Sequence, residues 1–382
     1  MQKGGEDVNT KMFFNSQLEA RERELAARLL ATGWQSWSTS ATKFFIFGKA
    51  CTFSPWFDDS LPNLLNEPLT LKPPVRGWCS WYAFGPDINE TKILQQAQWF
   101  SQHREIPIDY LLIDDGYTEC GDWLDVSQGK FPYGIENTAQ RIKDFGLRPG
   151  VWIAPFVAYS SSKLRRERPE FLAKDRNGFA VVPRVTRFDR FLPRRRFLLD
   201  FKHAAARTYL NRVIRVLIED YGFELLKLDF LYAIYFDPAL KPKEASDILH
   251  EFLVGIKRTY PHVYTIACGC PLIPAVGAVD SMRIGPDTTS PAVDGIPLAN
   301  NIYNYFVLKG VLKNIRTRSW TRAYWNVDPD AFVCRKSAGF SERQILILQN
   351  AMREARGNLF LGDDMPKLSS SRIEEFILPL FH

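Results

Sequence analysis

Histidine and cysteine are scarce in this chain of 382 residues, which holds five histidines and six cysteines. The cysteines are scattered along the chain, so they do not resemble the framework of a disulfide-rich secreted protein. Cys268 and Cys270 stand two apart, but no second cysteine pair or nearby histidine completes a metal site. The sequence therefore predicts reduced thiols and no metal centre.

Long apolar runs are also missing. The first residues, MQKGGEDVNTKMFF, lack an apolar signal core, and no run of eighteen apolar residues occurs. These absences predict a soluble, cytoplasmic protein without a membrane partner. Much of the net charge of +6 comes from residues 184–196, which hold six arginines but accompany no nucleic-acid-binding motif. We interpret this patch as a solvated loop face and expect no nucleic-acid partner.

Short apolar runs alternate with helical patterns from about residue 75 onward. Strands that alternate with helices pair in parallel through right-handed crossovers, and eight such units favour a closed (β/α)8 TIM barrel over an open sheet. We therefore predict a short N-terminal segment over residues 1–74, part helical at 17–31, and a barrel over residues 75–382. The expected strands lie within 75–84, 110–117, 148–156, 223–231, 263–269, 281–285, 322–327 and 358–364, and the expected helices within 91–103, 203–220, 244–258, 298–312 and 341–354.

Two opposite charges interrupt the most apolar of these runs, FELLKLDFLYAIYF at residues 223–236. Side chains two apart on a strand share a face, so Lys227 and Asp229 share an environment. Neither charge is stable when buried alone. The two residues either form a structural ion pair or face a polar cavity at the end of the strand.

Polar residues follow most of the predicted strands at their carboxyl ends. In a barrel these ends meet at one mouth, where enzymes of this fold keep their chemistry. Helix capping explains some of the carboxylates, such as Asp363 and Asp364, but not Asp229, which no helix start follows. The residues at these positions are Asp114, Asp115, Trp152, Asp229, Cys268, Asp287, Asp328, Asp363 and Asp364.

Paired carboxylates that face one cavity ringed by aromatic residues are what glycoside hydrolysis requires. One carboxylate attacks or stabilises the anomeric carbon, and the other gives a proton to the leaving oxygen. The first must stay ionised, and a lysine on the same strand face favours its charged form. This chemistry gives Lys227 a purpose that an isolated ion pair lacks.

Six motifs together resemble the α-galactosidases of glycoside hydrolase family 36, in the melibiase clan. They are RGWCSWY, LLIDDGYTECGDWL, GVWIAPF, LLKLDFLYA, CGCPLIPAVGAVDSMRIGPDTTSP and YWNVDPDAFVCR, in this order between residues 75 and about 364. The resemblance implies a TIM barrel that hydrolyses terminal α-linked galactose with retention. It also implies a small-molecule α-galactoside as the partner and neither a metal nor an organic cofactor.

The resemblance also assigns roles to single residues. The nucleophile of the family falls on Asp229 and its acid/base on Asp287. Sugar-binding carboxylates fall on Asp114 and Asp115, for the axial 4-hydroxyl and the 6-hydroxyl. Among the other positions, Trp152 would wall the sugar, Lys227 and Arg283 would hold hydroxyls and keep Asp229 charged, and Cys268 would leave room beside the 2-hydroxyl. For Trp78, Trp81 and Trp123, core packing is the stronger interpretation.

The chain departs from this family outside the barrel. Members usually carry a large β-sandwich before the barrel and a smaller β domain after it, whereas only about 74 residues precede the barrel here. We therefore expect both accessory domains to be curtailed, which leaves substrate affinity and the oligomeric state open. Three alternatives to hydrolysis of galactosides also stay open: an α-galactosyltransferase of the raffinose-synthase type, an α-N-acetylgalactosaminidase, and an inactive sugar-binding remnant.

Overall fold

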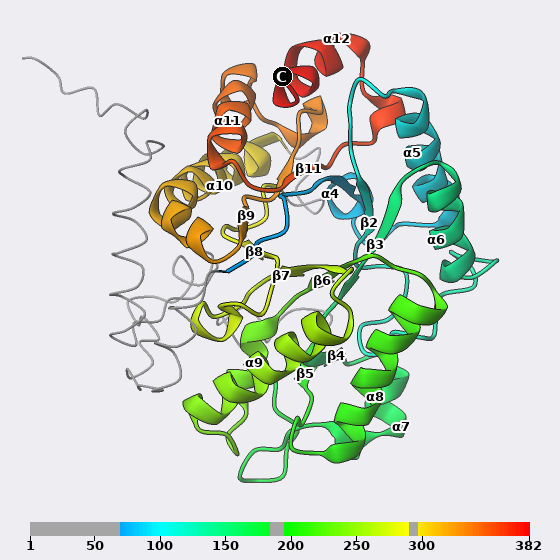
Figure 1. The fold of residues 1–382 in the computed structure, drawn as a ribbon, viewed down its shortest axis with the longest axis vertical. Helices are drawn as coiled ribbons and strands as arrows, with labels where there is room; N and C mark the ends of the chain where they lie inside the picture. The colour runs from blue at the N-terminus through cyan, green and yellow to red at the C-terminus, as the bar shows by residue number, and fades with distance from the viewer. Residues whose placement is uncertain (1–68, 184–194, 290–296) are drawn as a thin grey trace, which may run out of the picture.

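The computed structural model describes residues 69–183, 195–289 and 297–382. Within them, one curled sheet of nine strands forms the centre of the molecule, and its neighbouring strands pair in parallel (Figure 1). The strand order is β10-β11-β1-β2-β3-β6-β7-β8-β9. The strands are β1 (Arg76–Cys79), β2 (Tyr110–Ile113), β3 (Arg148–Ile153), β6 (Leu225–Leu228), β7 (Tyr264–Ala267), β8 (Ser281–Arg283), β9 (Asn326–Asp328), β10 (Ala331–Phe332) and β11 (Leu359–Leu361).

Helices surround this sheet (Figure 1). Strands such as β2, with sequence YLLI, are buried throughout. Continuous apolar runs of this kind are typical of parallel strands that are covered on both faces. The main helices are α5 (Glu90–Gln102), α6 (Ile135–Asp144), α8 (Ala204–Arg215), α9 (Pro242–Thr259), α10 (Pro297–Arg318) and α11 (Glu342–Ala355). The predicted alternation of strand and helix is confirmed, and each strand and helix expected after residue 74 overlaps an observed one.

The strand near residue 330 is interrupted. β9 pairs with β8, and β10 pairs with β11, while Pro329 and Asp330 separate β9 from β10. The observed strand β9 starts later than the strand expected at 322–327, because a short 3-10 helix at Ser319–Ala323 occupies the first residues of that range. The amide of Asn358, just before β11, donates to the carbonyl of Val327 in β9 at 2.9 Å. The segment from β9 to β10 therefore contacts both β8 and the start of β11.

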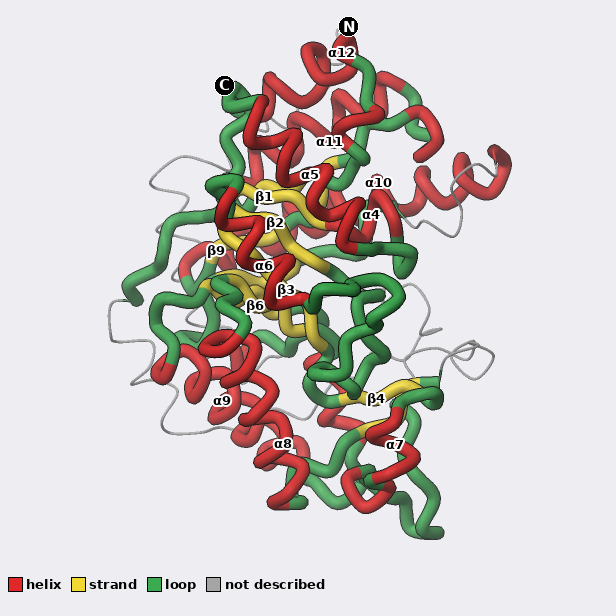
Figure 2. Tube along the Cα trace, turned by 90° about the vertical axis from the view of Figure 1, so that its right-hand side faces the viewer, coloured by secondary structure: helices red, strands yellow, loops and turns green. Residues whose placement is uncertain are grey.

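A small hairpin-like sheet lies beside the ends of the main strands, and the sequence did not predict it. It pairs β4 (Val157–Tyr159) with β5 (Arg196–Leu198) in antiparallel fashion, so that Tyr159 stands opposite Arg196. Figure 2 shows β4 apart from the main sheet and close to α7 (Lys163–Glu167). The chain after β3 therefore makes a second layer before it returns to α8.

The expected N-terminal segment over residues 1–74, including the helix at 17–31, lies for the most part outside the described residues. The described part begins beside β7, where the ammonium group of Lys72 donates to the carbonyl of Val263 at 2.7 Å and pairs with Asp280 at 3.0 Å. No helix in the described part of the chain is long and apolar enough to cross a membrane.

Candidate functional site

The predicted site residues lie at the carboxyl ends of adjacent parallel strands. Asp114 and Asp115 follow β2, Asp229 follows β6, and Cys268 follows β7. The register of the sheet brings these strand ends together. Trp152 in β3 pairs with Lys227 in β6, and Leu228 in β6 pairs with Ala267 in β7. Because parallel strands end at the same edge, the side chains after them converge there.

Cys268 directly follows β7 and is buried. Burial raises the pKa of its thiol well above the usual range; the Asp229 and Asp287 carboxylates add to that rise, whereas Arg283 and Lys227 oppose it. Two carboxylates and two cations predicted from the sequence thus act electrostatically on one buried thiol. The fold therefore brings together residues that are up to 60 positions apart in the chain.

Hydrogen bonds fix the orientation of Asp229. The indole N–H of Trp152 donates to its Oδ2 at 3.1 Å, and the amide of Phe230 donates to its Oδ1 at 2.6 Å. The amide of Asp229 itself donates to the carbonyl of Ile153 at 2.9 Å, which continues the β3–β6 ladder by one residue. Phe230 then turns the chain away with a φ of 51°, a left-handed conformation that is uncommon for a bulky residue. The carboxylate therefore stands at the point where the strand ends and the chain turns.

Lys227 forms its ion pair with Asp114. Its Nζ lies 2.7 Å from Oδ2 of Asp114, and the two side chains are only 7% and 5% exposed. Burial lowers the pKa of Lys227, but the Asp114 carboxylate and the thiols of Cys79 and Cys268 together outweigh this effect, so the pKa lies well above its ordinary value. The sequence left open an ion pair between Lys227 and Asp229 or a polar cavity. Lys227 does form a structural ion pair, but with Asp114, which directly follows β2, and not with Asp229. That Lys227 keeps Asp229 charged stays a prediction.

Asp114 and Asp115 make different contacts although they are neighbours. Asp114 accepts hydrogen bonds from Lys227 and from the thiol of Cys79 at 3.3 Å. Asp115 accepts one from the Tyr159 hydroxyl at 3.1 Å, and its own amide donates to Oδ1 of Asp114 at 2.9 Å. Asp114 is thus held inside the sheet, whereas Asp115 is directed toward β4.

Gly116 provides the turn that the pair of aspartates requires. Its φ is 122°, and a Cβ atom at this position would lie 2.5 Å from the carbonyl oxygen of Pro86. An L side chain there would meet both strain and a clash with the backbone. The chain therefore leaves the strand direction directly after Asp115.

Arg283 contacts Asp287, the second predicted carboxylate. The buried guanidinium donates from Nη2 to Oδ1 of Asp287 at 2.9 Å and to the carbonyl of Pro286 at 3.2 Å. The side chain of Asp287 is 51% exposed. The loop after β8 thus presents a carboxylate that is partly solvated and held at one oxygen by a buried cation.

Asp330 belongs to the same cluster, and sequence reasoning missed it. Its Oδ2 lies 2.6 Å from Nη2 of Arg283, and its Oδ1 accepts a hydrogen bond from the Tyr82 hydroxyl. Burial raises the pKa of Asp330 to about 6, against the opposing effect of Arg283. The signal in the sequence was the spacing of Asp328 and Asp330, two carboxylates that follow one another at the end of a predicted strand.

The tryptophans divide between the site and the core. Trp152 is buried and reaches Asp229 with its indole N–H. Trp123 is also buried and packs edge-on against Trp152 with ring centroids 5.6 Å apart. Trp78 donates to the carbonyl of Asp363 at 2.7 Å from within the core. The contacts of Trp78 and Trp123 are those of core residues, as expected from the sequence.

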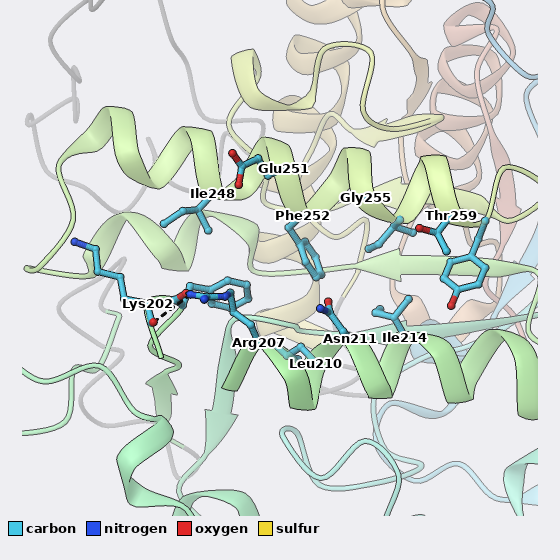
Figure 3. Close-up of a pocket in the computed structure, with 13 residues that line it drawn as sticks. Lys202, Arg207, Leu210, Asn211, Ile214, Ile248, Glu251, Phe252, Gly255 and Thr259 are labelled. Carbon is cyan, nitrogen blue, oxygen red and sulfur yellow. Dashed lines mark hydrogen bonds between the residues drawn. The ribbon is translucent and has the colours of Figure 1, made fainter. Parts of the chain in front are cut away.

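A cavity of about 610 Å³ lies away from this site, in the groove between α8 and α9 (Figure 3). Leu210, Asn211 and Ile214 of α8 face Ile248 and Phe252 of α9 across it. None of the predicted site residues lines this groove. Across the described ranges, histidine, cysteine and carboxylate side chains form no cluster of three or more that could hold a metal ion.

Comparison with known proteins adds an independent result. The family model described as Melibiase matches residues 73–268. The myogenesis-regulating glycosidase of Mus musculus is 32% identical over 154 residues, which are 40% of this chain and 20% of that protein. Alpha-galactosidase AgaA of Geobacillus stearothermophilus is 24% identical over 206 residues, or 50% of this chain and 26% of that protein. The chain thus spans about a quarter or less of the length of these curated relatives.

A solved structure matches more of the chain. The alpha-galactosidase TtGalA of Thermus thermophilus, in complex with p-nitrophenyl α-D-galactopyranoside, has a TM-score of 0.69 and 25% sequence identity. The match covers 84% of this chain and 65% of that protein. The same enzyme has also been solved in complex with stachyose. The fold therefore has a counterpart in a structure solved with a bound galactoside.

Proposed function

The chain belongs to the Melibiase family, and from this premise we propose that it is a retaining α-galactosidase. The observation that carries the proposal is that Asp229 directly follows β6 and that Asp287, bound by Arg283, lies in the loop after β8, at the same edge of one parallel sheet. A pair of carboxylates at the ends of barrel-type strands is the arrangement that glycoside hydrolysis uses. The proposed substrates are α-galactosides of the melibiose and raffinose type.

In the proposed first step, a carboxylate oxygen of Asp229 bonds to the anomeric carbon while the bond to the leaving oxygen breaks. Asp287 gives its proton to that leaving oxygen. In the second step, Asp287 takes a proton from water, the water oxygen bonds to the anomeric carbon, and the bond to Asp229 breaks. Two inversions give net retention, which requires the two carboxyl groups to stand about 5–5.5 Å apart.

The remaining predicted residues would bind the sugar. Asp115 and Asp114 would accept hydrogen bonds from the 6-hydroxyl and the axial 4-hydroxyl, and Trp152 would form a wall of the pocket. Lys227 and Arg283 would hold hydroxyls and favour the charged form of Asp229. Cys268, small and buried, would leave room beside the 2-hydroxyl. This chemistry uses neither a metal ion nor an organic cofactor, since carboxylates supply both the nucleophile and the proton.

We also propose that the nine strands act as the eight units of a closed (β/α)8 barrel over residues 75–382. In this arrangement β9 and β10 are the two halves of one interrupted strand. The hydrogen bond from Asn358 to Val327 and the pairing of β10 with β11 support closure between the seventh and eighth units. The eighth strand, β11, also pairs with β1 of the first unit. Closure would place all strand ends around one mouth.

A panel of aryl glycosides tests the proposed function. The protein is incubated with p-nitrophenyl α-galactoside, α-glucoside and α-N-acetylgalactosaminide, with Asp229→Ala as the control. We expect the wild-type protein to release p-nitrophenol from the galactoside and the Asp229→Ala variant to release none. Preference for the N-acetylgalactosaminide would instead indicate the related hydrolase, and a predominance of new galactosides over free galactose would indicate the transferase. Binding of galactose without any turnover would indicate an inactive sugar-binding protein.

A further inference from the structure

Asp330 is buried where three parts of the chain meet. It lies in the short connection between β9 and β10 and is 3% exposed. Its Oδ1 accepts from Tyr82, which follows β1, and its Oδ2 lies 2.6 Å from Nη2 of Arg283 on β8. The same Oδ2 accepts from the amide of Thr288 at 2.5 Å and from its hydroxyl at 2.9 Å. One carboxylate therefore joins the segment after β1, strand β8 and the loop after β8.

The backbone of Asp330 is held in an unusual conformation. Its φ is 90°, in a region that favours glycine, and it is one of three non-glycine residues with positive φ in the described part of the chain. Its amide donates to Oδ1 of Asp328 at 3.0 Å. A strained residue persists only where its surroundings fix it, and such residues cluster at functional sites.

These contacts converge on the residues that flank Asp287. Arg283 donates to Asp287 itself and to the carbonyl of Pro286, directly before it, while Thr288 directly follows it. We propose that Asp330 is a positioning residue, which sets the placement of the Asp287 carboxyl through Arg283 and Thr288. This inference rests on the proposed role of Asp287 as the acid/base. Asp330 itself is buried and is not assigned a contact with the sugar.

Several oxygen atoms share the guanidinium of Arg283, and this explains why a second carboxylate, that of Asp330, is needed beside Asp287. Four oxygen atoms lie within 3.3 Å of its Nη2: those of Tyr82, Pro286, Asp287 and Asp330. One guanidinium amino group carries only two hydrogens, so the acceptors compete for them. Asp330 offsets the charge of Arg283, which allows Asp287 to leave the cation and approach the sugar oxygen. Without Asp330, Asp287 would be the remaining carboxylate partner of Nη2, and the hold of Thr288 on the loop would weaken.

The test compares two galactosides whose leaving groups differ in how much they need a proton. Asp330→Asn keeps the shape of the side chain and removes its charge. We expect kcat/KM for raffinose, which has a poor leaving group, to fall by about 10²-fold, a loss typical of a misplaced catalytic group. For p-nitrophenyl α-galactoside, which needs little protonation, we expect a fall of no more than about 5-fold, since general acid catalysis contributes little there. Asp287→Ala should show the same selectivity to a greater degree.

Azide gives a readout that a purely structural role would not change. If Asp287 is misplaced as a base, the glycosyl-enzyme hydrolyses slowly, and azide can displace Asp229 at the anomeric carbon without proton transfer. Azide should therefore raise the turnover of p-nitrophenyl α-galactoside by Asp330→Asn and yield α-galactosyl azide, with no comparable effect on the wild-type enzyme. Equal losses on both substrates and no effect of azide would overturn the inference.

Asp363 offers a matched control. It is buried, pairs with Arg335 at 3.0 Å and accepts from the amide of Cys334 at 2.7 Å, but its contacts lie after β10 and do not flank Asp287. Asp363→Asn should lose activity equally on both substrates, if it loses any. Selectivity in this variant equal to that of Asp330→Asn would contradict a specific role for Asp330.

A milder variant covers the possibility that Asp330→Asn does not fold, which circular dichroism would show. Thr288→Val removes only the hydroxyl that contacts Asp330, and the same selectivity is expected to a smaller degree. A uniform loss in this variant would overturn the inference. Failure of the proposed function is distinguishable, because the wild-type protein would then hydrolyse neither galactoside.

Discussion

Lys227 on β6 reaches past β3 to form its ion pair with Asp114 at the end of β2, with 2.7 Å between Nζ and Oδ2. Asp229, two residues away in the sequence, instead accepts hydrogen bonds from Trp152 and from the amide of Phe230. The buried ion pair thus ties two strands that are not neighbours, whereas Asp229 stands at the strand end. The lysine is thus paired inside the sheet, and the carboxylate at the strand end is the one that we propose for chemistry.

The first prediction concerns this ion pair. Lys227→Met leaves the Asp114 carboxylate buried without its cation, so the free energy of unfolding should fall by about 3–5 kcal/mol. Lys243→Met serves as the control, because Lys243 and Asp247 are paired at 3.1 Å but are each 46% exposed. There the change should stay below about 1 kcal/mol. Urea unfolding measures both, and similar losses in the two variants would show that burial of the pair has no energetic consequence.

The second prediction concerns the nucleophile. Asp229→Ala should abolish hydrolysis even of p-nitrophenyl α-galactoside, because activation of the leaving group does not replace the attacking carboxylate. Azide added to this variant should attack the anomeric carbon from the vacated side and give β-galactosyl azide. Chromatography of the products checks this outcome. Turnover near the wild-type level would remove Asp229 from the role of nucleophile.

The third prediction separates binding from chemistry at Asp114 and Asp115. Replacement of either residue by asparagine should weaken inhibition by galactose more than it lowers kcat, since lost hydroxyl contacts affect the bound sugar and the transition state alike. Tyr159→Phe should give a smaller effect, because it removes only the hydroxyl that orients Asp115. Unchanged inhibition by galactose in both asparagine variants would place these carboxylates outside the pocket.

Much of the barrel-type sheet could be predicted from the sequence, because its strands are buried on both faces and stand out as short apolar runs between helical segments. The identity of the ion-pair partner of Lys227 could not, since it depends on how β2, β3 and β6 are arranged in space. Asp330 was missed for a related reason: its strand is broken after Asp328, and its partners Tyr82 and Arg283 are distant in sequence. The pairing of β4 with β5 joins two strands of three residues each across a long connection that contains α7, and strands this short leave no periodic signal.

The fourth prediction follows from the pKa of Asp330, which burial raises to about 6 in the folded protein. The charged and titratable groups that act on it are Arg283, Tyr82, Asp287 and Asp328. Between the ordinary aspartate pKa near 4 and this value, the folded state keeps a proton that the unfolded state loses. The contribution of Asp330 to stability is therefore greatest at low pH and falls, by on the order of 3 kcal/mol, as pH rises through about 6.

Asparagine at position 330 does not titrate, so it lacks this dependence. The stability of Asp330→Asn, measured as its free energy of unfolding minus that of the wild-type protein, should increase as pH rises from about 4 to about 7. Urea unfolding at a series of pH values measures the difference. A difference that stays constant over this range would contradict a raised pKa at Asp330.

We propose that Asp229 and Asp287 cleave an α-galactoside by two successive displacements. Proton NMR during hydrolysis of p-nitrophenyl α-galactoside distinguishes retention from inversion, because the anomeric signal identifies the first-formed sugar before mutarotation. We expect α-galactose as the first product, with carboxyl groups about 5–5.5 Å apart, whereas inversion needs about 6.5–9.5 Å. If β-galactose formed first, or no hydrolysis occurred, this mechanism would be wrong.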